Sequence, residues 1–270
     1  LRYRHVPHDK CTPNSPAASM VDVTWPISSS PVVQGSVVSL SGWGAFRFAK
    51  FYEAVDALTA DVAYRHADGF NKGITFVTAS HNHSHQLART VPGEDFTLRC
   101  YVTAAGGASL EVRTDGLQCD DSGVEHLVNV CHTTMVAVDK QTHRPKKGAI
   151  PPLEMDAHEV QAHEERNKLS DLHKQIRARR SAEPLQLRNM QSKPPKQEEF
   201  IHLHELFKNV PAMTEVPETI TMHTHSSSFV VSPEQRNVQG TLFGGVVMSN
   251  AFDLAYYAAK YFVRGRAFTP

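Results

Sequence analysis

The first half of the chain carries one helical pattern of apolar residues followed by a series of strand patterns. Between residues 46 and 64, apolar side chains recur at three- and four-residue spacing, which predicts an amphipathic helix. Strand-like runs follow at about 74–80, 95–104, 108–118 and 126–138. Gly106-Gly107, between the second and third of these runs, supplies a hairpin turn. One long helix followed by an antiparallel meander predicts an α+β domain.

The regions on either side of this pattern have a different character. Residues 1–30 are rich in Pro and Ser and are expected to form an extended arm. Residues 145–217 show little strand pattern, and residues 154–180 within them are polar and predicted to be helical. Residues 219–231 are predicted to form a strand, after which an apolar helix runs to about residue 263.

Composition and charge place the chain among ordinary globular proteins. It has 270 residues, of which 40% are hydrophobic, and this is enough for a sizeable core. The 28 basic and 28 acidic residues cancel, so no net field draws the protein to nucleic acid or to a membrane. No apolar stretch reaches the roughly 18 residues that a membrane span needs.

One segment departs from this balance of charge. Residues 166–196 contain nine basic and two acidic residues. Two interpretations stay open for it: a solvated helix between domains, or a surface that contacts RNA or a protein partner.

The cysteines show no Cys-x-x-Cys spacing; they are Cys11, Cys100, Cys119 and Cys131. We expect free thiols in a reducing compartment, with Cys100 and Cys131 packed in the core.

Paired glycines lie between a polar loop and the apolar helix near the C-terminus. The N-terminal end of a helix offers free backbone N–H groups and a partial positive charge, which suit a developing oxyanion. Glycines there let a ligand come close to the backbone. Gly244 and Gly245 are therefore candidate oxyanion donors. A packing requirement where the helix meets a sheet is the open alternative.

These motifs resemble those of the hotdog-fold acyl-CoA thioesterases, in their double-hotdog, mitochondrial form. Near the C-terminus the resemblance rests on three motifs: Arg236-Asn237, Phe243-Gly244-Gly245 and Ala251-Phe252-Asp253-Leu254-Ala255. Upstream it rests on residues 47–56, 74–80, 109–112 and 198–207. Together these motifs cover roughly residues 31–264.

The resemblance implies an α+β hotdog fold, in which an antiparallel sheet wraps around a long central helix. After the arm at 1–30, it implies a first hotdog domain at 31–150 and a polar helical linker at 151–217. The start of a second hotdog, its strand and central helix, would occupy 218–270. No further strands follow this helix in the sequence, so residues outside it or another chain are expected to cover the helix.

The resemblance also implies a catalytic site between two hotdogs. Carried over residue by residue, Asp56 would be the general base or water-orienting group, and Asn237 would position water or the thioester carbonyl. The N–H groups of Gly244 and Gly245 would bind the oxyanion. Asp253 is a second acidic candidate, whose register against the family's acidic position is open by one residue.

Several of these residues have structural alternatives. Asp56 lies on an apolar helix, where capping or bridging a neighbour is the other role. Asn237 can close its loop through a side-chain hydrogen bond. Glu53, one turn before Asp56, is expected on the surface. The first hotdog lacks its own Asn…Gly-Gly, since residues 42–47 stand in that place, so at most one of two pseudo-symmetric sites is equipped.

Alternating histidines raise the question of a metal. His81, His83 and His85 would share one face of a regular strand, and His223 and His225 repeat this spacing. Zinc sites usually take ligands from several elements, and the family needs no metal. We therefore expect exposed or hydrogen-bonded histidines, no metal, and no cofactor apart from the coenzyme A of the substrate.

Two functions follow as hypotheses. The leading one is hydrolysis of acyl-CoA to fatty acid and CoA in the mitochondrial matrix, without a covalent intermediate. The alternative is an inactive, thioesterase-derived subunit of a mitochondrial ribosome or respiratory complex, contacted through 1–30 and 166–196. A pseudo-dimer or oligomer through sheet edges is expected. The start at Leu1, with basic residues close behind it, fits a processed mitochondrial protein or an incomplete N-terminus.

Overall fold

The computed structural model divides the chain into two compact units. The first unit comprises Leu1–Leu172 and Val230–Pro270, and the second comprises His173–Phe229. The structure describes residues 2–5, 14–38, 46–68, 73–120, 122–155, 160–182, 196–208, 225–237 and 240–262.

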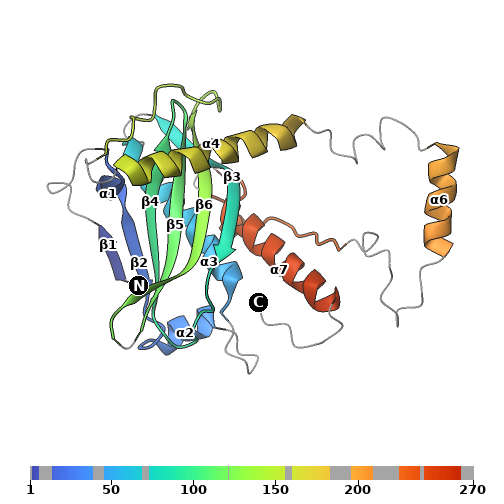
Figure 1. Ribbon diagram of the computed structural model, residues 1–270, viewed down its shortest axis with the longest axis horizontal. Helices are drawn as coiled ribbons and strands as arrows, with labels where there is room; N and C mark the ends of the chain where they lie inside the picture. The colour runs from blue at the N-terminus through green and yellow to red at the C-terminus, as the bar shows by residue number, and fades with distance from the viewer. Residues whose placement is uncertain are drawn as a thin grey trace. The chain divides into compact units, whose positions relative to one another are not determined.

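One antiparallel sheet of six strands forms the framework of the first unit, in the order β1-β2-β4-β5-β6-β3. The strands are β1 (Arg2–His5), β2 (Val21–Trp25), β3 (Ile74–Gln86), β4 (Phe96–Ala105), β5 (Ser109–Cys119) and β6 (Glu125–Asp139). The sheet curves around the helix α3 (Phe48–Ala67), which lies against one of its faces (Figure 1). The predicted α+β arrangement, a sheet wrapped around a long helix, is confirmed.

The core lies between α3 and the sheet. The three- and four-residue spacing brings Phe51, Val55 and Val62 onto one face of α3, where all three are fully buried. Each such side chain contributes roughly 1.5–3 kcal/mol by leaving water. The helix ends at Asp68, whose left-handed backbone, with a φ of 47°, stops the helical path.

The four predicted strands are all present, and the predicted hairpin joins two of them. Gly106 donates its backbone N–H to the carbonyl of Ser109 at 2.7 Å, which closes the turn between β4 and β5. The strand predicted at 74–80 continues to residue 86 as β3.

The structure corrects the boundary of the predicted N-terminal arm. Residues 1–30 contain β1, the short helix α1 (Pro16–Ser19) and β2, and β2 pairs with β4 as part of the sheet. Val21, Val23 and Trp25 are buried, while Asp22 and Thr24 between them face the other side. This period-two alternation is a strand signal inside a Pro- and Ser-rich segment.

A bulge changes which histidines share a face of β3. The register against β6 shifts between His81 and His83, so that His81 pairs with Thr133 and His83 pairs with the next residue, His132. Adjacent residues of a strand point to opposite faces. The prediction of one shared face is therefore wrong for His81, which lies on the α3 side. His83 and His85 do lie together, with ring centroids 4.6 Å apart.

The helix α7 (Gly244–Phe262) packs beside α3 within the first unit (Figure 1). The ring of Phe252 lies 5.8 Å from that of Phe48 and 5.5 Å from that of Tyr52, both on α3. The predicted apolar helix is thus confirmed as far as Phe262. A short 3₁₀ helix, η3 (Pro233–Gln235), and a loop lead into it.

The remaining helices of the described ranges are α2 (Pro31–Val37), α4 (Val160–Ala182) and α6 (Gln197–Lys208). The polar helix predicted in residues 154–180 is present as α4. The strand predicted at 219–231 is corrected in its described part, because residues 225–231 belong to no strand; residues 219–224 lie outside the described residues. None of the helices in the described ranges is long and apolar enough to cross a membrane.

Candidate active site

A buried carboxylate lies where α3, β3 and the start of α7 meet. Asp56 projects from the middle of α3, and only 3% of its surface is exposed. Its neighbour Val55 points into the apolar core. Because a buried carboxylate is costly without hydrogen-bond donors, the groups around Asp56 define what it can do.

Three polar groups approach the Asp56 carboxylate. Thr78 on β3 donates its hydroxyl to Oδ1 at 2.7 Å, and Gly245 donates its backbone N–H to Oδ2 at 2.8 Å. The imidazole Nε2 of His81 lies 3.4 Å from Oδ1. Gly245 follows Asp56 by 189 residues, so the fold and not the local sequence assembles this site. The positive end of the α7 dipole also faces the carboxylate.

The paired glycines allow α7 to come close to α3. A Cβ on Gly245 would lie 2.8 Å from the Cα of Glu53, and one on Gly244 would lie 2.9 Å from Oδ2 of Asp56. Packing therefore constrains both positions, but against the helix α3 and not against a sheet, as the alternative had it. In this structure the N–H of Gly245 is bound to Asp56, so it does not stand ready for an oxyanion.

Asn237 closes the loop that leads into α7. Its Nδ2 donates to Oγ1 of Thr241 at 2.8 Å, and its Oδ1 accepts the backbone N–H of Thr241 at 3.1 Å. The backbone N–H of Asn237 donates to the carbonyl of Thr241 at 2.8 Å. These contacts match the loop-closing alternative, and none of them reaches Asp56.

The two other acidic candidates lie nearer the surface. Asp253 on α7 is exposed, and partial desolvation and the charge of Glu53 raise its pKa, while Lys50 acts in the opposite direction. Glu53, expected on the surface, is half-buried and forms an ion pair with Lys50 at 2.7 Å. Neither carboxylate has the enclosed position of Asp56.

Thr78 and His81 are the site residues that the sequence analysis did not assign to the catalytic site; His81 was considered there only as a metal ligand. Both belong to β3, and the residue pattern of a strand does not show that one of its polar residues contacts a carboxylate on a helix. The signal available was the excess of polar residues after Thr78 on a strand whose preceding residues, 74–76, are buried. The bulges that aim these side chains depend on the pairing with β6.

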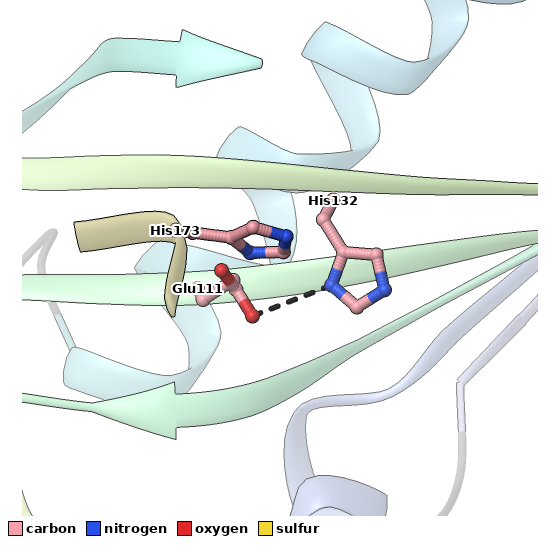
Figure 2. Close-up of side chains that lie close together, drawn as sticks. All are labelled: Glu111, His132 and His173. Carbon is pink, nitrogen blue, oxygen red and sulfur yellow. Dashed lines mark hydrogen bonds and ion pairs between the residues drawn. The ribbon is translucent and has the colours of Figure 1, made fainter. Parts of the chain in front are cut away.

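A second polar cluster lies on the opposite face of the sheet. Glu111 and His132 are almost fully buried there, with Oε1 of Glu111 3.3 Å from Nδ1 of His132 (Figure 2). Thr103 and Asn82 donate further hydrogen bonds to Glu111, at 3.2 and 3.0 Å. These hydrogen bonds stabilise the buried carboxylate of Glu111.

Known proteins similar to this chain are acyl-coenzyme A thioesterases. Acyl-coenzyme A thioesterase 4, mitochondrial, of Humulus lupulus is 25% identical over 257 residues, which cover 90% of this chain and 46% of that protein. Acyl-coenzyme A thioesterase 10, mitochondrial, of Mus musculus is 24% identical, and the alignment covers 93% of this chain and 57% of that protein. Acyl-coenzyme A thioesterase 2, chloroplastic, of Humulus lupulus is 23% identical, and the alignment covers 82% of this chain and 51% of that protein. The chain spans about half the length of the curated relatives it matches. No family model matches the chain.

Solved structures share its fold. An apo-hexameric acyl-CoA thioesterase aligns with a TM-score of 0.50 and 23% identity, over 63% of this chain and 97% of that chain. An acyl-CoA hydrolase from Bacillus cereus aligns with a TM-score of 0.50 and 19% identity, over 62% and 93%. The chain therefore has the hotdog fold that its motifs predicted. The alternative of an inactive structural subunit has no support in these names, all of which are names of enzymes.

Proposed function

We propose that this chain takes part in the hydrolysis of acyl-CoA to free fatty acid and coenzyme A. The observation that carries the proposal is the buried Asp56 carboxylate, which is held by Thr78 and by the N-terminal end of α7. The names of its relatives supply the class of substrate, an acyl-coenzyme A thioester.

Asp56 is the general base in this proposal. Water attacks the thioester carbonyl and passes a proton to Asp56; the tetrahedral oxyanion then collapses and expels the CoA thiolate. The proton held by Asp56 goes to that thiolate, so that acid and thiol are the only products. General bases of this kind contribute about 10²–10⁴-fold to the rate. No metal and no cofactor enters the sequence of steps.

The other candidate residues have supporting roles in the proposal. Asn237 positions the water or the thioester carbonyl, for which its amide has to leave Thr241. The N–H groups at the start of α7, at Gly244 and Gly245, bind the oxyanion, and that of Gly245 first has to exchange its bond to Asp56. Asp253 is the second carboxylate that can serve as the base.

The test is acyl-CoA hydrolysis by the purified chain over short, medium and long acyl groups, with released CoA separated by chromatography. Asp56→Asn is expected to lower kcat at least about 100-fold, because the amide cannot accept the proton. Asp61→Asn is the matched control, a carboxylate of the same helix that is ion-paired with Arg65, and it should stay within about twofold of the parent chain. A folded parent chain without turnover would refute the proposal for this chain.

Asn237 needs its own control because it also holds the loop. Asn237→Ala removes the amide, while Thr241→Val removes the hydroxyl that the amide contacts. If Asn237 acts on the substrate, its loss lowers kcat at least about tenfold more than the loss of the Thr241 hydroxyl. Equal effects would assign Asn237 to loop closure alone. Asp253→Asn in the same assay decides whether Asp253 contributes to turnover.

We propose a mitochondrial location, in the matrix. Two of the relatives above are named as mitochondrial and one as chloroplastic. Protease protection in intact mitochondria and in mitoplasts tests this: a matrix protein survives in both, and recovery in another fraction would contradict the proposal.

We also propose that the protein assembles through an edge of its sheet. β3 is an outermost strand of the sheet, and an edge strand offers unpaired backbone groups to a neighbouring strand. One similar solved structure is described as hexameric. Light scattering after size exclusion should give a mass above that of one chain, and a monomer at all concentrations would rule this assembly out.

A further inference from the structure

His81 connects the Asp56 carboxylate to a second strand. The bulge in β3 turns its imidazole toward α3, with Nε2 3.4 Å from Oδ1 of Asp56. Its other nitrogen, Nδ1, lies 2.8 Å from Oγ1 of Thr133 on β6. Thr133, His81 and Asp56 thus form a chain of polar groups that crosses from the sheet to the helix.

The surroundings of the ring select one of its two neutral tautomers. Nε2 of His81 is shielded from water and makes no hydrogen bond, although Oδ1 of Asp56 lies 3.4 Å from it. If Nε2 carried no proton, its lone pair would face the lone pairs of a carboxylate oxygen, which is repulsive. With the proton on Nε2, Nδ1 is free to accept the hydroxyl hydrogen of Thr133.

The donors also distinguish the two oxygens of Asp56. A carboxylate oxygen offers two lone-pair positions. Oδ1 is approached by both Thr78 and His81, whereas Oδ2 is approached by Gly245 alone among the described residues. The remaining position is therefore on Oδ2, beside the N-terminal end of α7, and a substrate water hydrogen-bonded there would be next to the proposed oxyanion donors.

We propose that His81 is a positioning residue for Asp56: its Nε2–H holds Oδ1, and Thr133 fixes the tautomer that makes this possible. The inference rests on the proposed function for its kinetic consequence. A base that is itself oriented by a third group is a recurring arrangement in enzymes. Apo structures often show such hydrogen bonds as long contacts that shorten in the substrate complex, which fits the 3.4 Å separation.

The kinetic test separates orientation from packing. His81→Leu keeps a side chain of similar size but removes the hydrogen-bond donor. It should lower kcat about 10–100-fold and leave KM within about threefold, because a misoriented Asp56 slows the attack of water and does not weaken substrate binding. His81→Gln places an amide N–H at a similar reach and should recover kcat to within about fivefold of the parent chain. His83→Gln, on the opposite face of β3, is the control and should stay within about twofold. The proposal would be overturned if His81→Gln lowered kcat as much as His81→Leu, or if His81→Leu left kcat unchanged.

Thr133 gives a second kinetic arm. Thr133→Val removes the hydroxyl that fixes the tautomer and should lower kcat about three- to tenfold, while Thr133→Ser keeps the hydroxyl and should preserve it. In the His81→Leu background Thr133→Val should have no further effect, because the two residues act through one path. Additive losses would contradict that path.

Nitrogen NMR tests the arrangement without relying on turnover. In the ¹⁵N-histidine-labelled chain at about pH 8, where histidine is ordinarily neutral, His81→Gln identifies the signals of this ring. We expect the Nε2–H tautomer. Finding the Nδ1–H tautomer would overturn the proposal whether or not the chain hydrolyses acyl-CoA. Absent turnover with the Nε2–H tautomer would refute the proposed activity and leave the arrangement of His81 standing.

Discussion

Gly245 shows how a single missing side chain shapes the candidate site. A Cβ at this position would press on the backbone of Glu53, which cannot move without displacing α3. Gly245→Ala is therefore expected to lower the free energy of unfolding by roughly 2–3 kcal/mol, the upper part of the range for overpacking. Urea unfolding followed by circular dichroism measures this change.

The matched control is the exposed Gly35 in α2, where an added Cβ meets nothing within 4 Å. Gly35→Ala should be neutral or stabilise by up to about 1 kcal/mol, because alanine is the better helix former. If Gly245→Ala behaves like Gly35→Ala, the close approach of the two helices is not a constraint on this position.

Among single residues, the sequence predicted part of the candidate active site. The motifs pointed to Asp56 and to the glycines, which the structure brings together, but Asn237 instead contacts Thr241. Thr78 was not named, and His81 was considered only as a metal ligand. Their direction depends on bulges in the pairing of β3 with β6, and register is a property of two strands that no local pattern contains.

One aromatic side chain, Phe252, contributes to the packing of α7 on α3. Phe252 contacts the rings of Phe48 and Tyr52. Phe252→Ala should cost roughly 1–3 kcal/mol, less than the 3–5 of a fully buried Phe because the side chain is only partly buried. Amide hydrogen exchange should then rise in α7 first. Val247 of α7 is 48% exposed, so Val247→Ala is the control and should leave amide hydrogen exchange in α7 almost unchanged.

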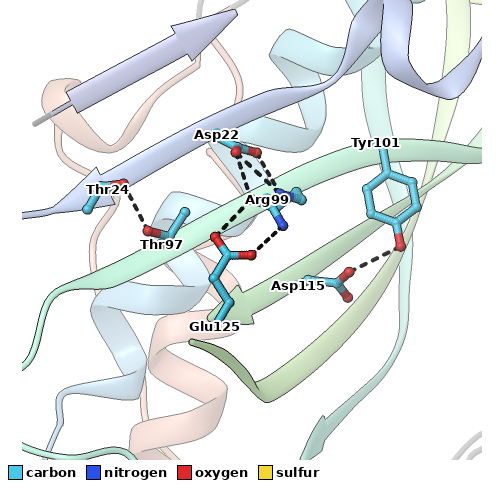
Figure 3. A network of polar contacts seen from close by, with 7 residues as sticks. All are labelled: Asp22, Thr24, Thr97, Arg99, Tyr101, Asp115 and Glu125. Carbon is cyan, nitrogen blue, oxygen red and sulfur yellow. Dashed lines mark hydrogen bonds and ion pairs between the residues drawn. The ribbon is translucent and has the colours of Figure 1, made fainter. Parts of the chain in front are cut away.

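An ion-pair network links three strands on the outer face of the sheet. Arg99 of β4 donates to Asp22 of β2 at 3.0 Å and to Glu125 of β6 at 2.9 Å (Figure 3). Hydrogen bonding from Arg99 lowers the pKa of Glu125 and raises that of Arg99 itself. Arg99→Gln should therefore cost about 1 kcal/mol near neutral pH, as expected for a partly exposed but bidentate pair.

The cost of Arg99→Gln should depend on pH with a definite sign. A carboxyl whose pKa is lowered on folding stabilises the protein above its unfolded-state pKa, and this stabilisation is lost as the pH falls through the folded-state pKa. The difference between parent chain and variant should be constant from about pH 8 to 6 and shrink below about pH 4. Urea unfolding at each pH measures it; a difference that grows on acidification would contradict the assignment to Glu125.

At the scale of elements, most of the first unit could be predicted. The helix α3 and strands β3 to β6 follow from the local pattern of apolar residues, even though β5 and β6 bury most residues of both their faces. β2 was missed because the composition of residues 1–30 hid a five-residue alternation whose partner, β4, lies more than 70 residues away. The predicted strand at 219–231 shows the opposite error in its described residues, 225–231, which carry a strand pattern but belong to no strand.

For the molecule as a whole, two buried thiols can report whether the sheet opens as one piece. Cys100 on β4 and Cys131 on β6 lie on either side of β5, and both are fully buried. Burial raises the pKa of the Cys131 thiol to about 12 and also raises that of Cys100. Since the thiolate is the reactive form, both thiols should be unreactive until the sheet opens.

Labelling should therefore separate the described cysteines by rate. In the Cys11→Ser chain, which leaves aside a residue outside the described ranges, exposed Cys119 should react within the mixing time at neutral pH. Cys100 and Cys131 should react at least about 10³-fold more slowly, and their labelling rates should depend on urea in the same way, because residues of core strands become accessible only through global unfolding. Mass spectrometry of quenched samples gives both rates. Labelling of Cys131 well ahead of Cys100 would mean that β3 and β6 detach first, and Asp56 would then lose Thr78 and His81 before the rest of the sheet opens.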